Sequence, residues 1–335
     1  MAGAVALLSG GLDSQLAARL VIEQGIRVVG LHFTSVFNAA PKPGEPTPAE
    51  RAAETLGISL LKEDISERQM QILRDPPHGF GSAANPCIDC HMAMLTAAAR
   101  RMGEAGADFL VTGEVVGQRP MSQRRHVLGM IDRETGLGGL ILRPLSAKLL
   151  EQTRPEADGL IDRDRLEGIR GRSRFRQMAL ARRFGIRKYP SPAGGCLLTD
   201  RGFGERVHDL LLHDELDLNG AHLLKVGRHY RLAPGTKAVV GRDEPENIRI
   251  EELVRDGDIL IELADMPGPM CLLRGGRSED IVRTAASLAA RVSKARRLET
   301  ARVRVRSVYA EDDGRLIEVA PAPDELAGEL SVNAA

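Results

Sequence analysis

The strongest chemical signal in the sequence is a glycine turn near the N-terminus. Residues 9–14 read Ser-Gly-Gly-Leu-Asp-Ser and lie between a short apolar run and a helical pattern. Two glycines let the backbone turn tightly and present several N–H groups in one concavity, and the following helix adds the positive end of its dipole. The turn therefore predicts a phosphate or pyrophosphate site with a Mg²⁺ ion beside it. The residues assigned to the anion are Ser9, Gly10, Gly11 and Ser14, and the residue assigned to Mg²⁺ is Asp13.

Two observations limit this interpretation. The chain contains no G-x-x-x-x-G-K-[ST] pattern, which excludes a Walker loop and its phosphate-binding lysine. An ordinary glycine turn, with the aspartate acting only as a helix cap, is the plainer alternative.

Three of the four cysteines form the second group of reactive residues. Cys87 and Cys90 are spaced as C-x-x-C at the expected start of a helix, where the dipole lowers the pKa of a thiol. Cys196 follows a glycine pair far along the chain. Three thiolates are one ligand short of a closed site, so they favour a 4Fe–4S cluster with one open iron.

Other uses of these cysteines stay open. His91 could be a fourth ligand and complete a zinc site. Alternatively, one cysteine carries a persulfide and another resolves it as a disulfide. Inert buried cysteines are a further alternative, although Asn-Pro and Gly-Gly neighbours are not typical of a core. Cys271 lies in an apolar run, and we expect it in the core.

These residues are positioned by short apolar strands that alternate with amphipathic helices, a pattern that predicts a parallel sheet covered on both faces. In such a sheet, ligands bind beyond the carboxyl ends of the strands. Gly113, Glu114 and Gln118 follow the expected strand 108–112 and so lie in a ligand-contact position, although Glu114 could also be a helix-start carboxylate. The expected strands are 4–8, 27–33, 58–61, 108–112 and 140–142, and the expected helices are 13–24, 49–56 and 88–102.

A basic segment, 162–188, is predicted to be helical, and the prolines and glycines of 189–195 predict a loop after it. The domain boundary is expected near 201–204. A smaller α+β unit should follow, with strands at 238–240, 248–250, 259–263 and 303–308 and a helix at 278–298. The predicted domains are therefore 1–200 and 205–330.

The glycine turn, placed directly after the first strand, resembles the PP-loop of the N-type ATP pyrophosphatases. That family holds pyrophosphate while AMP passes to a substrate oxygen, so the resemblance implies ATP, Mg²⁺ and an adenine nucleotide alpha hydrolase-like fold. In this fold the second strand ends beside the PP-loop, which implies that backbone groups near His32 and Phe33 contact adenine.

Residues 112–118 and 142–145 closely resemble the PP-loop domain of the bacterial tRNA 4-thiouridine synthetase, through Gly-Glu-x-x-Gly-Gln and Leu-Arg-Pro-Leu. By this resemblance, Gly113, Glu114 and Gln118 shape the pocket for the nucleotide and the target uridine. The cysteine pair and the later glycine-flanked cysteine are also similar to the tRNA 2-thiouridylase.

The C-terminal part resembles the RNA-binding module of NFACT proteins, on residues 225–232 and 237–244. Alternating basic and apolar residues would place a row of cations on an exposed sheet face, where they could contact phosphates. The cations are Lys225, Arg228, Arg231, Lys237 and Arg242. The alternative is that these charges are only solvated. The basic segment 163–188 could likewise face tRNA or be only solvated.

Composition sets outer limits. Lysine plus arginine equals aspartate plus glutamate at 46 each, so only a local basic cluster can favour nucleic acid. The 335 residues include no run of about 18 apolar residues and no N-terminal signal pattern. We therefore expect a cytoplasmic protein with no membrane partner.

Together the motifs predict an enzyme that adenylates a uridine carbonyl oxygen of tRNA and replaces it with sulfur. 4-Thiouridine is the favoured product, with 2-thiouridine as the alternative. The expected partners are tRNA and a sulfur donor, either inorganic sulfide or a cysteine desulfurase, and a homodimer is compatible with the sequence. Two rivals are a small-molecule amidotransferase or sulfurtransferase and a non-catalytic RNA-binding factor with a degenerate PP-loop.

Overall fold

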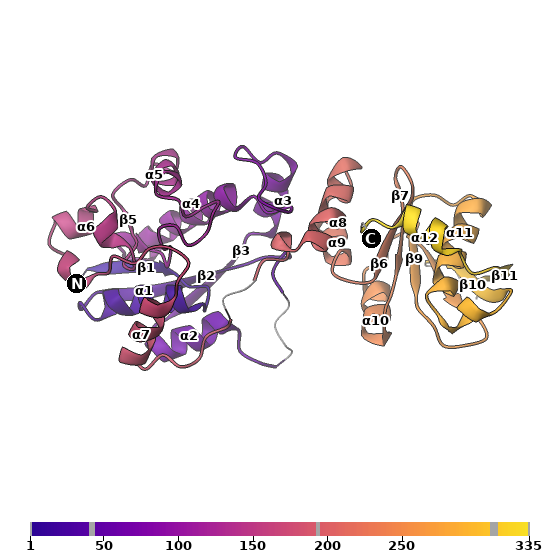
Figure 1. Cartoon of the computed structure of the whole chain (residues 1–335), viewed down its shortest axis with the longest axis horizontal. Helices are drawn as coiled ribbons and strands as arrows, with labels where there is room; N and C mark the ends of the chain where they lie inside the picture. Colours follow the sequence, from indigo (N-terminus) through magenta and orange to yellow (C-terminus); the bar gives the residue numbers. More distant parts are fainter. Residues whose placement is uncertain (1, 40–43, 192–194, 309–313, 334–335) are drawn as a thin grey trace. The chain divides into compact units, whose positions relative to one another are not determined.

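The computed structural model describes residues 2–39, 44–191, 195–308 and 314–333. Two compact units are present (Figure 1). Unit 1 takes the residues up to Cys196 except 82–84, and unit 2 takes 82–84 and the residues from Leu197 onward. Each unit has its own sheet.

The sheet of unit 1 has five parallel strands in the order β3-β2-β1-β4-β5. They are β1 (Gly3–Leu7), β2 (Arg27–Thr34), β3 (Leu60–Asp64), β4 (Phe109–Val111) and β5 (Ile141–Leu142). This confirms the α/β class predicted from the alternating pattern. The strand order reverses direction between β1 and β4, and the crevice at such a point is where open parallel sheets bind ligands.

Helices cover both faces of this sheet because the side chains of β1 alternate between two cores. Ala4 and Ala6 face the core that contains α1, whereas Val5 faces the core that contains α4. The helices are α1 (Leu12–Ile22), α2 (Pro48–Leu56), α3 (Ser66–Arg74), α4 (Cys87–Ala105), α5 (Arg125–Glu134), α6 (Arg154–Ala157) and α7 (Phe175–Arg183), with short 3-10 turns at Ala147–Leu149 and Arg163–Arg165.

Unit 2 is built on an antiparallel sheet in the order β11-β10-β8-β9-β7-β6. Its strands are β6 (Arg228–Ala233), β7 (Thr236–Val240), β8 (Ile259–Leu263), β9 (Cys271–Arg274), β10 (Ala301–Ser307) and β11 (Arg315–Val319). Its helices are α8 (Arg201–Leu212), α9 (Leu218–Leu223), α10 (Glu244–Glu252), α11 (Glu279–Arg291) and α12 (Asp324–Leu330), with 3-10 turns at Leu197–Thr199 and Lys294–Arg297. The alanines of α11 pack on one sheet face, and Ile250 of α10 packs in a second core.

Two local predictions are wrong. Residues 248–250, expected as a strand, lie inside α10, because Asp243 caps its first turn by accepting a hydrogen bond from the Glu246 N–H. The basic segment 162–188 is not one helix: only α7 and one 3-10 turn are regular, and Gly171 adopts φ +81° between them. In the described part of the chain, no helix is long and apolar enough to cross a membrane.

Candidate active site

The glycine turn follows β1 and leads directly into α1. Gly10 has φ +79°, and a Cβ atom there would lie 2.2 Å from the Pro48 carbonyl carbon at the start of α2. A Cβ on Gly113 would lie 2.5 Å from the Ser14 backbone nitrogen. Any side chain at either position would push the loops apart. Glycine is therefore required both in the turn and in the loop after β4 that touches it.

The serines of the turn bond within the turn itself. Ser9 Oγ and Ser14 Oγ are 3.2 Å apart, and Ser9 Oγ accepts from the Gly11 N–H at 3.3 Å. No side chain caps the start of α1. The first N–H groups of this 11-residue helix are thus open toward the concavity, which is the arrangement that binds a phosphate.

Asp13 lies in a network of polar side chains from three parts of unit 1. Gln118 Nε2 donates to Asp13 Oδ2 at 2.7 Å, and Gln177 Nε2 donates to Gln118 Oε1 at 3.1 Å. Arg174 Nη2 lies 3.9 Å from Asp13 Oδ1. Of the predicted residues, the structure therefore brings Gln118 together with Asp13, and it adds Arg174 and Gln177 of the α7 region.

Several buried polar atoms around this network have no hydrogen-bond partner among the described residues. They are Asp13 Oδ1, Gln15 Oε1, Gln123 Oε1, Arg174 Nε and Gln177 Oε1. Buried polar atoms in folded proteins are nearly always paired, so an unpaired group of this kind fits a polar ligand. ATP and Mg²⁺ both suit this set, because it offers open N–H groups, a guanidinium and a free carboxylate oxygen.

Sequence patterns alone did not single out Arg174 and Gln177 within their long basic segment. Their spacing of three residues places them on one face of a helix, which is the signal that could have found them. Gln15 was also missed. Its side-chain amide donates to the Gly10 carbonyl oxygen at 2.9 Å, and this buried hydrogen bond stabilises the glycine turn.

His32 and Phe33 lie just before the last residue of β2, which pairs with β1. His32 Nδ1 lies 3.0 Å from the carbonyl oxygen of Leu8, immediately before the glycine turn. Burial lowers the pKa of His32, and this favours the neutral ring. Phe33 is partly buried against the core that contains α4.

Glu114 is the centre of a buried ionic network. It accepts hydrogen bonds from Thr112 Oγ1 at 3.0 Å and from Arg143 Nε at 2.9 Å, and it pairs with His91 Nδ1 at 3.0 Å. Burial would raise the pKa of Glu114, but Arg143 and His91 outweigh it and hold that pKa well below its usual range. Glu114 thus stays ionised. Through His91 it joins the loop after β4 to the helix that carries the cysteine pair.

The three cysteines converge at the carboxyl edge of the sheet. Cys87 and Cys90 lie in the first turn of α4. The backbone of Cys196 forms an isolated antiparallel β-bridge with that of Asn38, which follows β2. Burial raises the pKa of Cys90 to about 12, and the neighbouring Cys196 and Cys87 add to the effect. Amide donors approach two of the sulfurs: Gln69 contacts Cys90 Sγ and Asn85 contacts Cys87 Sγ, both at 3.1 Å.

The cysteines do not adopt the geometry of a metal site. Across residues 2–39, 44–191, 195–308 and 314–333, no three His, Cys, Asp or Glu side chains lie close enough together to hold an ion. The donor chemistry suits iron and sulfur, but the sulfurs would have to approach one another to ligate a cluster. Cys271, by contrast, is fully buried in β9, as expected for a core residue.

In unit 2 the exposed position predicted for Lys237 is wrong. Lys237 is only 5% exposed, because β7 is an interior strand whose residues are buried on both faces, and its ammonium pairs with Asp209 at 2.7 Å. Arg231 also pairs with Asp209, as well as with Glu215. Alternation predicts exposure only where one sheet face is open to water.

The other three cations differ from one another. Lys225 is half-buried, and burial lowers its pKa. Arg242 is paired with Glu246, whereas Arg228 is exposed at the start of β6. Of the five cations, Arg228 therefore fits the predicted exposed face best.

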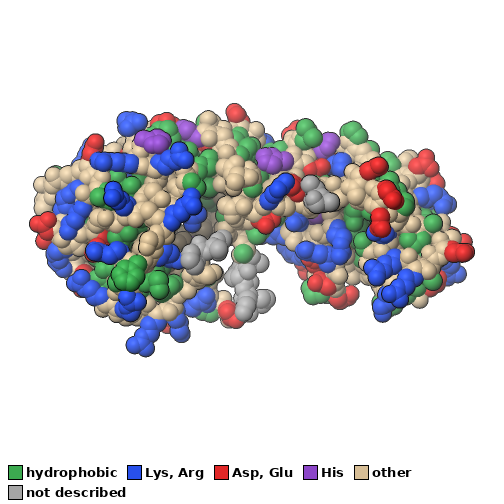
Figure 2. Space-filling view, in the orientation of Figure 1, with side chains coloured by type: hydrophobic (Ala, Val, Ile, Leu, Met, Phe, Trp, Pro, Cys, Tyr) green, Lys and Arg blue, Asp and Glu red, His purple; other side chains and the backbone are tan. Residues whose placement is uncertain are grey.

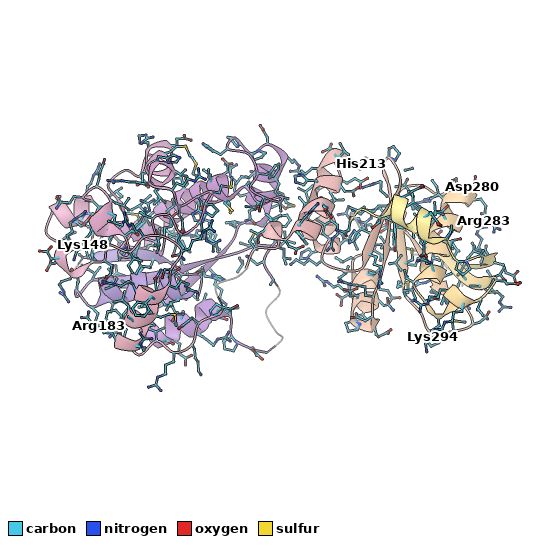
Figure 3. All side chains as sticks on the ribbon, in the orientation of Figure 1. Lys148, Arg183, His213, Asp280, Arg283 and Lys294 are labelled. Atoms are coloured by element: carbon cyan, nitrogen blue, oxygen red, sulfur yellow. The ribbon has the colours of Figure 1, made fainter. Side chains whose placement is uncertain are left out.

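A second group of cations in unit 2 is exposed and makes no ion pair with any described residue. It comprises Lys294, Arg296 and Arg297 of the 3-10 turn after α11, and we call it the basic turn. Blue side chains gather in Figure 2 where Figure 3 labels Lys294. The basic turn is thus a local cluster of charge that the neutral composition could not reveal.

Two families match separate parts of the chain. Residues 2–149 match the family described as thiamine biosynthesis protein (ThiI), and residues 227–329 match the NFACT protein RNA binding domain. Both resemblances seen in the sequence are confirmed. The ThiI match contains the glycine turn, the cysteine pair and Gln118, and the NFACT match contains Arg228 and the basic turn.

Curated relatives include tRNA-specific 2-thiouridylases MnmA. The protein of Pelobacter propionicus is 40% identical over 117 residues, which is 32% of this chain and 31% of that protein. The protein of Rhodococcus erythropolis is 31% identical over 173 residues, covering 46% of this chain and 47% of that protein. The matched region thus spans less than half the length of these relatives.

Similar solved structures are more distant. One is a 4-thiouridine synthetase in complex with RNA and bound ATP, at 18% identity and a TM-score of 0.32, covering 55% of this chain and 52% of that one. Another is a predicted subunit of a tRNA methyltransferase from Methanocaldococcus jannaschii, at 17% identity and a TM-score of 0.32, covering 48% of this chain and 74% of that one.

Proposed function

We propose that this protein is an ATP-dependent tRNA-uridine sulfurtransferase. The observation that supports it best is topological: the glycine turn, the Asp13–Gln118 pair and the three cysteines all lie at the carboxyl edge of one parallel sheet. A nucleotide-activating group and a sulfur-carrying group are both needed to exchange oxygen for sulfur, and here they share one edge.

The proposed reaction has two steps. A uridine carbonyl oxygen attacks the α-phosphorus of ATP, and pyrophosphate leaves into the concavity formed by Ser9, Gly10, Gly11 and Ser14. A sulfur nucleophile then attacks the uracil carbon, and AMP leaves with the original oxygen. Activation is needed because a carbonyl oxygen is a poor leaving group, whereas AMP is a good one.

The residues around Asp13 would support the first step electrostatically. Mg²⁺ on Asp13 and the guanidinium of Arg174 would neutralise the phosphate charge that develops as pyrophosphate leaves. Gln118 and Gln177 would hold the Asp13 carboxylate in place. We assign adenine to the backbone around His32 and Phe33, as the resemblance implied.

Cys87, Cys90 and Cys196 would deliver the sulfur. A 4Fe–4S cluster on these residues is the carrier that we propose first, and its open iron would supply a site for hydrosulfide. The persulfide route is the alternative, and it needs no approach of all three sulfurs to one metal. The donor would be inorganic sulfide on the cluster route and a cysteine desulfurase, which transfers sulfur that is already oxidised to the persulfide level, on the persulfide route.

The tRNA would be held in part by unit 2, through phosphate contacts of Arg228 and the basic turn. 4-Thiouridine is the product that we favour, because residues 112–118 and 142–145 resemble the 4-thiouridine synthetase and lie within the ThiI family match. 2-Thiouridine is the alternative, because the curated relatives are named for it. A cytoplasmic location suits a reaction on tRNA.

The test is pyrophosphate release from ATP by the full chain, with and without unmodified tRNA, followed by mass spectrometry of the tRNA nucleosides. We expect tRNA-stimulated release and a thiolated uridine when sulfide is supplied. Asp13→Asn should reduce both to background without changing the melting temperature. Glu23→Gln, on an exposed ion pair at the end of α1, is the control and should be active.

The outcomes separate the rivals. Release that needs a small molecule and not tRNA would favour the small-molecule transferase. No release under any condition, with tRNA still bound, would favour the non-catalytic RNA-binding factor. Wild-type ATP consumption by Asp13→Asn would contradict the PP-loop assignment itself.

A further inference from the structure

An exposed phenylalanine lies beside the nucleotide site. Phe175, the first residue of α7, is 72% exposed, and it is the one phenylalanine of the seven in the chain with such exposure. Its neighbour Arg174 reaches to within 3.9 Å of Asp13 Oδ1, and Gln177 bonds to Gln118. The ring of Phe175 therefore projects from an element whose other side contacts the glycine-turn site.

The outer face of α7 continues this feature. Met178, one turn along, is 46% exposed, and Arg182 follows on the same face at the next turn. The buried residues of the helix are Gln177, Leu180 and Ala181, which form its inner face. An apolar strip on an otherwise polar helix face, next to a site, is a candidate contact surface.

The charge around Phe175 identifies the occupant as a polyanion. Between residues 168 and 199 the sequence has no aspartate or glutamate, in a chain whose net charge is zero. Six cations of this stretch are exposed and make no ion pair with a described residue: Arg170, Arg172, Arg182, Arg183, Arg187 and Lys188. Figure 2 shows many blue side chains over the part of unit 1 where Figures 1 and 3 place α7 and Arg183.

We propose that Phe175 is a stacking platform for an unpaired base of the RNA substrate, next to the target uridine, and that the surrounding cations contact the flanking phosphates. Aromatic rings bind unpaired bases by stacking, and arginines and lysines around them bind the backbone. A protein partner would need acidic residues opposite this surface, whereas an RNA strand supplies phosphates for the cations and bases for the ring together. The proposal rests on the proposed function, because it names the RNA contact of that same site.

The experiment measures binding of an unmodified tRNA transcript to the full chain. Phe175→Ala and Phe175→Leu should each raise the dissociation constant about tenfold, whereas Phe175→Tyr should bind like the wild type. Leu212→Ala, at an apolar residue of unit 2 that is 81% exposed, is the matched control and should change nothing. The slope of affinity against salt should stay constant for Phe175→Ala and decrease for Arg172→Ala.

Three outcomes would overturn the proposal. The first is wild-type binding by Phe175→Ala. The second is wild-type affinity in Phe175→Leu but not in Phe175→Ala, which would mean a general apolar contact. Phe175→Ala shifting the sedimentation coefficient of the free protein would mean that a second copy docks there. Because binding is measured without ATP, the result is independent of pyrophosphate release, so failure of this inference and failure of the proposed function can be told apart.

Discussion

Gln118 donates its side-chain amide to Asp13 at 2.7 Å across a separation of 105 residues. The bond joins the loop after β4 to the first turn of α1, which follows β1, and β1 and β4 are the two strands at which the sheet order reverses. Gln177 extends the contact to α7. The proposed metal ligand is thus held by Gln118, which Gln177 holds in turn, before any ligand binds, and this reduces the reorganisation that binding requires.

Arg174 should contribute to ATP binding. Arg174→Ala removes the guanidinium beside Asp13, and we expect a dissociation constant for ATP about tenfold higher by calorimetry, as for loss of a charged hydrogen bond. Arg176→Ala is the matched control, since Arg176 pairs with Glu167 on the exposed side of α7. Equal affinities in the two variants would remove Arg174 from the site.

The cysteines should separate into two classes. Replacing Cys87, Cys90 or Cys196 with alanine should abolish thiolation, whereas Cys271→Ala should retain it, because Cys271 lies in the core of unit 2. Pyrophosphate release should survive in all four variants, because the thiols act after adenylation. Thiolation by a Cys196→Ala variant would contradict the role assigned to the trio.

Iron content decides between the two sulfur routes. Protein purified without oxygen should be brown and hold about four irons per chain if the cluster forms. Each of the three alanine variants should lose that iron, and Cys271→Ala should keep it. Colourless, iron-free protein that still thiolates tRNA would rule out the cluster and leave the persulfide route, with Cys196 as the sulfur carrier.

The basic turn should bind phosphates. Replacing Lys294, Arg296 and Arg297 together with alanine should weaken tRNA binding and decrease the slope of log affinity against log salt by about two to three, one contact for each cation. Arg249→Ala is a control, because Arg249 is already paired with Glu252. An unchanged slope in the triple variant would leave Arg228 and the α7 surface as the RNA contacts.

Lys237 gives a pH dependence with a definite sign. Burial lowers its pKa from 10.5 to about 8, even though Asp209 opposes the shift. Between these values the unfolded chain binds more protons than the folded one, so stability should rise with pH in that window. The free energy of unfolding of the wild type, minus that of Lys237→Met, should increase from about pH 8 toward pH 9.5. A constant difference over this range would mean that Lys237 titrates normally.

The sequence by itself determined the parts of the protein that depend on local order. Gly10 after an apolar run dictates a tight turn into α1, because its φ of +79° is a backbone that glycine adopts without strain. The alternation of strands and helices dictated the parallel sheet, and the C-x-x-C spacing placed Cys87 and Cys90 in one helical turn. These are properties of neighbouring residues.

Tertiary structure alone decided which distant side chains meet and which are buried. Arg174 and Gln177 approach Asp13 only because α7 packs on α1, and no local pattern contains that distance. Lys237 looked exposed because basic and apolar residues alternate along its strand. Both faces of this interior strand are covered, so the alternation does not predict which of its side chains are exposed. Periodicity specifies which residues share a face, and packing then decides whether that face meets water, a core or a ligand.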